Sequence, residues 1–463
     1  MNVTPPPSAP VPVSSSAPAA PAPGPASPAQ TASHVSSGHA MHAFARELFP
    51  ICRSITGPGL RETLARIGQR VPLTVHEVPS GTPVLDWEVP MEWTIRQGWL
   101  KAPDGRVLAD FSRSNLQVVN YSAPVHARMP LAELRPHLHS LPERPTWIPY
   151  RTSYYKRDWG FCLPHAVVES LGPGDYEVFI DSTLEPGSLS YGECVIPGES
   201  SDEVLVSCHA CHPSLANDNL SGLVVATWLA MSVASRPHRL TYRFVFIPGT
   251  IGSITWLARN PEAVQRVRHG LLLTCCGDAG AFTYKKSRRG DAVVDRAAAH
   301  VLRGNGQQSR IIDFFPYGYD ERQYCSPGYN LPLGCLMRTP HGEFPEYHTS
   351  ADNLDLITPG ALEESLRTAG AILEVLDANR RYRSLNPCGE PQLGRRGLYR
   401  QTGGDKHLAE LQMAYLWVLN LADGEHDLLA MAERASLPFQ ILARAADDLL
   451  RVGLLEETKR HDA

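Results

Sequence analysis

One stretch near the middle of the chain, Glu203 to Leu223, constrains the fold more than any other. A short apolar run at 203–206 predicts a buried strand, and a second apolar run predicts a helix from Leu223 to about Val233. The loop between them is rich in side chains that bind metals: Cys208, His209, Cys211, His212 and Asp218. Open α/β sheets form their binding sites at the carboxyl ends of strands. The stretch therefore predicts an α/β fold with a site at this edge of the sheet.

This loop has two interpretations. In the first, His209 and Asp218 bind a metal ion. In the second, the cysteines are a reduced thiol pair beside a helix cap, and Asn217 and Asp218 only accept hydrogen bonds from free N–H groups. The ligand types suit zinc, but their spacing matches no closed structural zinc site. The loop alone leaves both interpretations open.

Composition excludes several classes of protein. The formal net charge of −5 gives no reason to expect a nucleic acid or an anionic membrane as partner. No apolar run approaches the roughly 20 residues that span a bilayer, and the first residues show no secretory signal. Ten cysteines are too few for a disulfide scaffold in a chain of 463 residues. We therefore expect reduced thiols and a cytoplasmic protein without a membrane partner.

The first half of the chain divides into regions that differ in composition and hydrophobic pattern. Residues 1–40 are rich in Pro, Ala and Ser and are expected to be disordered. Residues 86–150 hold four tryptophans, three of them within 86–122 beside hairpin patterns, which predict a small β-rich domain. It interrupts an α/β domain that comprises 41–85 and 151–380, where strands alternate with helices up to a closing helix at 359–378. We expect a mixed sheet with helices on both faces.

The last part of the chain predicts a separate module. Residues 381–404 are interpreted as a connector, and 405–463 as a winged-helix domain with three helices. Its third helix carries Asp447 and Asp448, whereas a DNA-recognition helix presents a basic face to phosphates. A nucleic acid is therefore not the expected partner. A protein partner or a homo-oligomer is expected instead.

Groups that could converge on a metal lie in four stretches: 209–218, 276–280, 319–328 and 346–355. One histidine and one aspartate from the first, with an aspartate and a histidine from later stretches, suit zinc, cobalt or manganese with open positions for water. Such a metal lowers the pKa of its water and polarises a carbonyl, as amide hydrolysis at neutral pH requires.

The order of these stretches resembles the zinc-dependent aminopeptidase and glutaminyl-cyclase superfamily over roughly 203–356. The resemblance is carried mainly by Asp218-Asn219-Leu220-Ser221-Gly222 and Tyr347-His348-Thr349. More narrowly, the whole chain resembles a bacterial family of aminopeptidase-like proteins with an inserted β-domain and a C-terminal winged helix. The signatures of that family are present at 211–222, 248–257, 287–291 and 320–328. The resemblance implies a zinc-aminopeptidase-like α/β fold and one or two zinc ions.

The resemblance also implies roles for individual residues. His209 corresponds to the first zinc ligand, Asp218 to the metal-bridging carboxylate, Asp278 to a later acidic ligand and His348 to the last histidine. Asp320 occupies the place of an active-site acid that forms hydrogen bonds within the pocket. His212 is a further candidate ligand that competes with His209, which is preferred because it directly ends the strand.

Two departures from the superfamily pattern bear on activity. Peptidases of this type carry two glutamates after the middle strand, where this chain has Gly249-Thr250. The aspartate that orients the first histidine is replaced by Cys211. Either one metal remains, with Glu321 or Asp320 as the base, or the site binds a ligand without hydrolysing it.

These observations predict a metal-dependent, zinc-containing hydrolase that acts on an amide or peptide bond of a small or modified aminoacyl substrate. Glu321 is the first candidate for proton transfer, and Arg322 or Tyr324 could hold the oxyanion. His212 and Tyr347 are assigned to the substrate pocket. The alternative is a catalytically silent binding or regulatory protein, which the missing glutamates favour.

Overall fold

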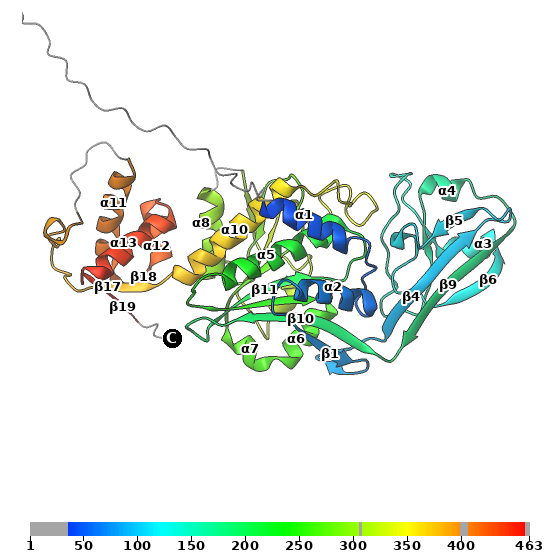
Figure 1. Ribbon diagram of the computed structural model, residues 1–463, viewed down its shortest axis with the longest axis horizontal. Helices are drawn as coiled ribbons and strands as arrows, with labels where there is room; N and C mark the ends of the chain where they lie inside the picture. The colour runs from blue at the N-terminus through cyan, green and yellow to red at the C-terminus, as the bar shows by residue number, and fades with distance from the viewer. Residues whose placement is uncertain (1–35, 305–307, 399–405, 459–463) are drawn as a thin grey trace, which may run out of the picture. The chain divides into compact units, whose positions relative to one another are not determined.

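The computed structural model describes residues 36–304, 308–398 and 406–458, and its largest element is an eight-stranded sheet (Figure 1). Parallel strands form its centre, β10 runs antiparallel to β1 and β12, and β14 runs antiparallel to β16 but parallel to β15. The predicted mixed α/β sheet is confirmed. In sheet order the strands are β1 (Thr74–Pro79), β10 (Ser188–Ile196), β12 (Thr241–Ile247), β11 (Glu203–His209), β13 (Val267–Leu273), β16 (Leu333–Met337), β14 (Thr283–Lys285) and β15 (Arg310–Ile312).

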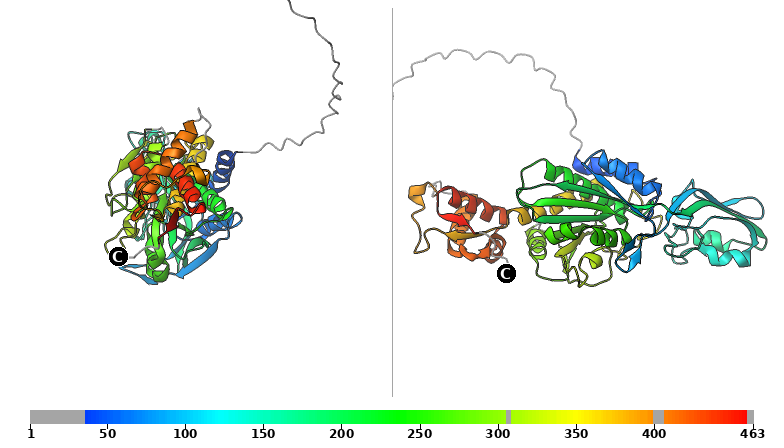
Figure 2. Two further views of the ribbon diagram at one scale, coloured as in Figure 1. Left: turned by 90° about the vertical axis from the view of Figure 1, so that its left-hand side faces the viewer. Right: turned by 90° about the horizontal axis from the view of Figure 1, so that it is seen from below.

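Helices cover both faces of this sheet, as predicted (Figure 2). Alternate residues of β11 enter opposite cores, so that Val204 and Val206 face one core and Leu205 the other. The first core contains α1 (Ser37–Leu48), α2 (Pro58–Gly68), α5 (Gly222–Ala234), α8 (Val293–Gly304) and α10 (Pro359–Ala378). The second contains α6 (Ile251–Arg259), α7 (Pro261–Arg266) and α9 (Glu321–Tyr324).

The inserted β-rich module is larger than its predicted range of 86–150. Its four-stranded antiparallel sheet takes a central strand, β9 (Asp175–Glu185), from the range assigned to the α/β domain. β9 pairs with β4 along nearly its whole length. Local composition does not show which distant strand a segment will pair with, so the sequence placed β9 in the wrong domain. The other strands of the module's sheet are β4 (Glu92–Lys101), β5 (Val107–Asp110) and β6 (Val125–Pro130). Smaller elements nearby are β2 (Pro83–Val84), β3 (Trp87–Glu88), α3 (Leu131–Leu134), β7 (Leu138–His139), β8 (Phe161–Cys162) and α4 (His165–Glu169).

The C-terminal module also begins earlier than predicted. β17 (Arg381–Ser384), in the predicted connector, pairs with both other strands of a three-stranded sheet. The remaining elements are α11 (Lys406–Leu421), β18 (Asp423–Asp427), α12 (Leu428–Ala435), α13 (Phe439–Arg451) and β19 (Leu455–Glu457). Disorder was predicted for residues 1–40, of which 1–35 lie outside the described part. Residues 37–40 belong to helix α1 (Ser37–Leu48), so the prediction is wrong for them.

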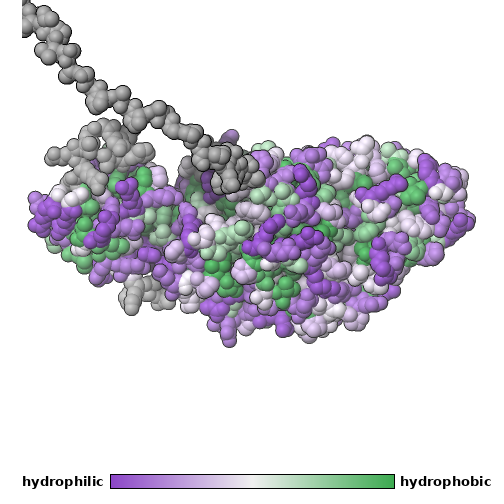
Figure 3. Space-filling model, viewed as in Figure 1, coloured by the Kyte–Doolittle hydropathy of each residue, from purple (hydrophilic) through white to green (hydrophobic). Residues whose placement is uncertain are grey.

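Across the part of the chain that the structure describes, no helix combines the length and apolar character needed to cross a bilayer. Figure 3 shows hydrophilic residues spread over the face in view, with smaller hydrophobic areas between them.

Candidate metal centre

The candidate site forms where β11 ends at the carboxyl edge of the parallel strands. His209 is the last residue of β11, and His212 follows in the loop that leads to the short helical turn η3 (Ala216–Ser221) and then to α5. The buried guanidinium of Arg53 donates from Nε to the carbonyl oxygen of His212 at 2.8 Å and so fixes this loop. The strand–loop–helix arrangement predicted from the sequence is confirmed.

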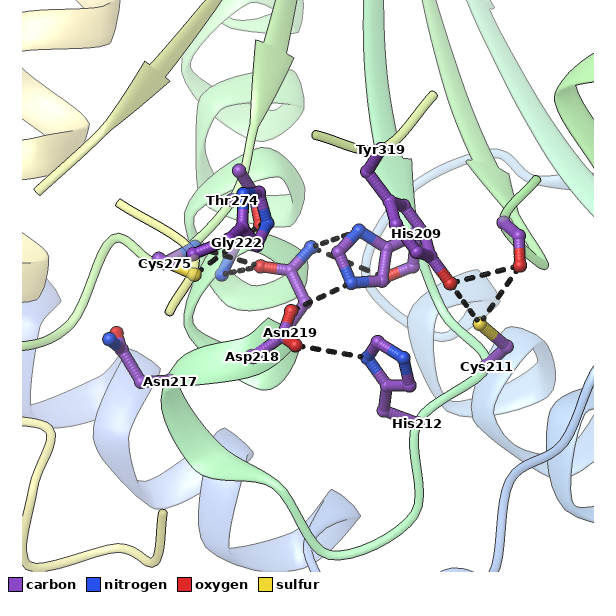
Figure 4. Close-up of polar contacts among 12 residues, drawn as sticks. His209, Cys211, His212, Asn217, Asp218, Asn219, Gly222, Thr274, Cys275 and Tyr319 are labelled. Atoms are coloured by element: carbon purple, nitrogen blue, oxygen red, sulfur yellow. Dashed lines mark hydrogen bonds and ion pairs between the residues drawn. The ribbon is translucent and has the colours of Figure 1, made fainter. Parts of the chain in front are cut away.

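Asp218 lies at the centre of three imidazoles. Its Oδ1 is 3.0 Å from Nε2 of His209, and its Oδ2 is 3.0 Å from Nε2 of His348 and 3.5 Å from Nδ1 of His212. The side chains of His209, His212 and Asp218 are buried, whereas that of His348 is 33% exposed. Figure 4 shows His209 and His212 both directed at Asp218. The structure therefore joins both histidines to the carboxylate, and the preference for one over the other was unnecessary.

The two asparagines beside Asp218 hold its backbone in place. The Asn217 side chain donates to Oδ2 of Asp278 and accepts from the N–H of Gly277, both at 2.9 Å. The Asn219 side chain accepts from the N–H of Gly222 at 3.2 Å and that of Cys275 at 3.3 Å. The backbone N–H of Asp218 donates to Asp352 at 3.0 Å. The capping interpretation thus applies to the asparagines, and the Asp218 carboxylate is left to face the histidines.

The protonation states suit a metal. Burial lowers the pKa of His209 to about 4 and also lowers the pKa of His212, so both imidazoles are neutral at pH 7. Burial alone would raise the pKa of Asp218, but His212, His209 and His348 hold it well below its usual range. An ionised carboxylate that faces neutral imidazoles is the form in which such ligands bind a metal.

An unpartnered atom supports the same conclusion. Nδ1 of His212 is buried and has no hydrogen-bond partner among the described residues. Ligand atoms of His209, His212 and Asp218 lie within 4.8 Å of one another. A metal ion between them would satisfy that nitrogen, and two imidazoles with a carboxylate are a donor set that zinc accepts. The residues present therefore fit zinc.

A second group shares Asp218 and was missed by the sequence reasoning. It consists of Asp218, Cys275 and His341, whose ligand atoms also lie within 4.8 Å of one another. Nε2 of His341 is 3.1 Å from Oγ1 of Thr274. Cys275 follows β13 and His341 follows β16, two parallel strands that end at the same sheet edge. Their position after these strands is the signal that could have identified them.

Asp278 lies outside both groups, so its prediction as a metal ligand is corrected. Its carboxylate accepts hydrogen bonds from the side chains of Asn217 at 2.9 Å and Thr339 at 2.7 Å. It follows the end of β13 by five residues, and Cys275 occupies the position that faces Asp218. Asp278 thus supports the loop through Asn217.

The two predicted catalytic acids are also outside the groups around Asp218. Glu321 is buried and forms an ion pair with Lys285, and it accepts from the N–H of Tyr319 at 2.9 Å. Burial would raise the pKa of Glu321, but Lys285 keeps it below its usual value. Asp320 accepts from Ser253 at 2.7 Å, and burial raises its pKa to about 7. The prediction of Glu321 as the base is therefore corrected, because Lys285 occupies its carboxylate.

The predicted oxyanion residues do not reach the site either. Tyr324 is fully buried in the second core, where its hydroxyl pairs with Oγ of Ser207 at 3.0 Å. Arg322 makes one long hydrogen bond to the carbonyl of Gly318 at 3.5 Å. Both assignments are corrected, since the short helix α9 directs these side chains elsewhere. Tyr347 does lie at the site and stacks on His348 with ring centroids 3.9 Å apart.

Tyr319 contacts both positions at which the chain departs from the peptidase pattern, Cys211 and Gly249. Its hydroxyl is 3.2 Å from Sγ of Cys211 and donates to the carbonyl of Gly249 at 2.9 Å, and its ring is 4.1 Å from that of His209. A Cβ atom at position 249 would lie 1.9 Å from Cε1 of Tyr319. Tyr319, which the sequence reasoning had not singled out, therefore fills the space that a glutamate at 249 would need.

Comparison with known proteins agrees with this architecture. Residues 42–379 match a family described as a domain of unknown function (DUF4910), and residues 380–457 match a winged helix-turn-helix family. A Clostridium acetobutylicum protein, provisionally named a polysaccharide biosynthesis protein with an aminopeptidase-like domain, is 47% identical over 91% of this chain and 96% of its own length.

Solved structures show the same fold. A crystal structure of a provisionally named peptidase from Clostridium acetobutylicum is 45% identical, covers 91% of this chain and 97% of its own, and has a TM-score of 0.86. The zinc aminopeptidase of Bacillus subtilis has a TM-score of 0.56 over 73% of this chain and 94% of its own. At 13% identity, the latter similarity concerns the fold alone.

Proposed function

The chain belongs to the DUF4910 family and has an aminopeptidase-like fold, and from this premise we propose that it is a zinc-dependent hydrolase of an amide bond. Its substrate is a small or modified aminoacyl compound. The observation that carries the proposal is the ionised Asp218 among His209, His212 and His348. When bound there, zinc would supply an activated water and polarise the substrate carbonyl.

Hydrolysis also needs a group that moves a proton. Gly249 and Thr250 provide no ionisable side chain, and the carboxylate of Glu321 is held by Lys285. His341 lies beside Asp218, and burial lowers its pKa, so its neutral imidazole can accept a proton. We assign His341 as the proton carrier if one zinc is bound, and as a ligand with Cys275 if two are bound.

Metal analysis tests the proposal. We expect purified wild-type protein to contain zinc and Asp218→Asn to lose at least about 100-fold in zinc affinity, since removing a ligand costs more than removing its supporting partner. The matched control is Asp355→Asn, which changes an exposed carboxylate outside both groups and should keep its zinc. Equal zinc content in Asp218→Asn and wild type would refute the site.

Turnover is measured separately. A panel of aminoacyl and acyl amides, with and without a chelator, should yield a product only in the zinc-loaded protein. His341→Gln distinguishes the two roles of that residue. Retained zinc with lost turnover indicates proton transfer, and a halved zinc content indicates a second metal position.

One observation favours a second function, a binding protein without catalysis. Tyr319 closes the space where the superfamily's glutamate would lie, with its hydroxyl held by Gly249 and Cys211. Such a protein would retain zinc and bind substrate analogues but release no product from any amide in the panel.

A further inference from the structure

A cavity of about 380 Å³ adjoins the exposed side of the metal centre. His348 is among its lining residues and is 33% exposed, whereas His209 and Asp218 are 0% and 1% exposed. His348 is therefore the residue through which this cavity borders the centre. A larger cavity of about 700 Å³, beside α2 and β4, has none of the metal-centre residues in its lining.

Among the described residues, this lining contains no carboxylate. Its basic residues are Arg151, which carries a positive charge, and the histidines His139 and His348. Arg151 is exposed and makes no hydrogen bond or ion pair through its guanidinium with any residue that the structure describes. Burial and then the charge of Arg151 lower the pKa of His139, as expected for neighbouring groups. The nearby carboxylate of Asp158 is paired with Lys156 at 3.0 Å.

The backbone that carries Arg151 is fixed on both sides. The N–H of Tyr150 donates to the carbonyl of the metal-centre residue His348 at 2.7 Å, and the carbonyl of Arg151 accepts from Asn120 at 2.8 Å. The guanidinium is thus an uncommitted cation on an ordered segment. Because the backbone is already held, binding a ligand here has to immobilise only the side chain.

Two aromatic side chains border the same opening. The rings of Tyr150 and Tyr347 lie with centroids 5.1 Å and 3.9 Å from that of His348, and both residues line the cavity. They provide apolar surface for the body of a ligand between the basic group and the metal centre.

We propose that Arg151, assisted by His139, binds an anionic group of the substrate, a carboxylate, phosphate or sulfate. The planar guanidinium matches such groups with two parallel hydrogen bonds. This inference rests on the proposed function, because it takes the cavity beside His348 as the place of the substrate. It narrows the substrate class to compounds with a negative charge away from the bond that is cleaved.

Anion binding tests the proposal without turnover. Inorganic phosphate and succinate are each titrated by calorimetry into zinc-loaded wild type and into Arg151→Gln of equal zinc content. We expect the dissociation constant of at least one anion to rise about 10- to 100-fold in Arg151→Gln, the usual effect of losing hydrogen bonds to a charged group. The probe that responds distinguishes phosphate from carboxylate ligands.

Arg157→Gln is the matched control, since Arg157 is an exposed arginine of the same segment that does not line the cavity. It should bind both anions as wild type does. A change of less than twofold in Arg151→Gln, or an equal loss in Arg157→Gln, would overturn the proposal.

Turnover provides a second test of the role of Arg151. A succinyl amide and a butyryl amide of the same amine differ in a terminal carboxylate, and wild type should cleave the succinyl compound with the higher kcat/KM. Arg151→Gln should abolish this preference, and a preference that persists in this variant would overturn the proposal. If neither amide is cleaved, the proposed hydrolase fails, and the calorimetric comparison still decides whether Arg151 binds anions.

Discussion

The neighbouring imidazoles keep the Asp218 carboxyl group ionised. A carboxyl group in so buried a place would favour the protonated form, yet three imidazoles lie within 3.5 Å of its oxygens. Removing the carboxylate therefore leaves the buried imidazoles of His209 and His212, and the partly exposed one of His348, without their common partner. Among the described residues of the centre, this one is the least replaceable.

Glu321 illustrates how a buried acid can be structural. Glu321→Gln removes the partner of the buried Lys285, and we expect it to lower the free energy of unfolding by about 3–5 kcal/mol. Zinc content and turnover per folded molecule should not change. Denaturant unfolding and metal analysis of the same preparation measure both quantities.

The double variant Lys285→Met/Glu321→Leu is the control for Glu321→Gln. It should recover most of the lost stability, because neither charge then lacks a partner. A loss of turnover in Glu321→Gln at unchanged stability would contradict the structural role and restore the base assignment.

Asp320 predicts a pH dependence of stability. Its pKa of about 7 in the folded protein lies above the ordinary value near 4, so the folded state holds a proton that the unfolded state releases. Its contribution to stability is complete below pH 4 and is lost as the pH rises to about 7. The free energy of unfolding of Asp320→Asn, relative to that of wild type, should therefore rise between pH 5 and pH 8 by on the order of 2–4 kcal/mol.

Urea unfolding at the two pH values checks the Asp320 prediction. Asp355→Asn, which removes an exposed carboxylate, serves as the control and should leave the pH dependence unchanged. A difference between Asp320→Asn and wild type that is equal at both pH values would contradict the prediction.

At the scale of elements, the end of β12 and the start of α9 are packed against each other through Gly249 and Tyr319. Gly249→Ala should destabilise the protein by about 1–3 kcal/mol, because the added methyl group meets the tyrosine ring. The same change in a Tyr319→Ala background should cost less. A double-mutant cycle on unfolding free energies measures the coupling, and additive effects would contradict the contact.

Sequence patterns located the elements that depend on local periodicity. The closing helix α10 was predicted at its observed bounds, and the β11–loop–α5 unit was predicted with His209 at the end of its strand. β9 and β17 were assigned to the wrong modules, because a strand's partners depend on pairing over long sequence distances. The same limit applies to the site. Whether Asp278 or Cys275 faces Asp218 depends on how the loop after β13 packs against the loop after β11, and these two loops are far apart in the chain.

At the scale of the whole chain, the winged-helix module shares a core with the α/β domain. Leu376 of α10 and Leu428 and Leu442 of the winged helix belong to one apolar cluster. Arg296 on α8 adds ion pairs, at 3.2 Å to Asp427 and 2.6 Å to Glu433. The module is therefore packed on the domain rather than loosely tethered. That it serves a protein partner or a homo-oligomer, and not a nucleic acid, stays a prediction.

Arg296→Met tests this contact. We expect a loss of about 1–3 kcal/mol in unfolding free energy, since two partly buried carboxylates would lose their cation. The control Arg303→Met changes an exposed arginine of the same helix and should have little effect. Equal effects of the two variants would show that the ion pairs contribute nothing specific.

The packing of Tyr319 over Gly249 also governs what descendants of this chain can become. A single substitution that introduced a glutamate at position 249 would insert it into occupied space, and loss of the tyrosine alone would leave a void beside His209. Either change alone is therefore expected to lower the free energy of unfolding. A carboxylate can be built in at position 249 only together with a smaller side chain at position 319.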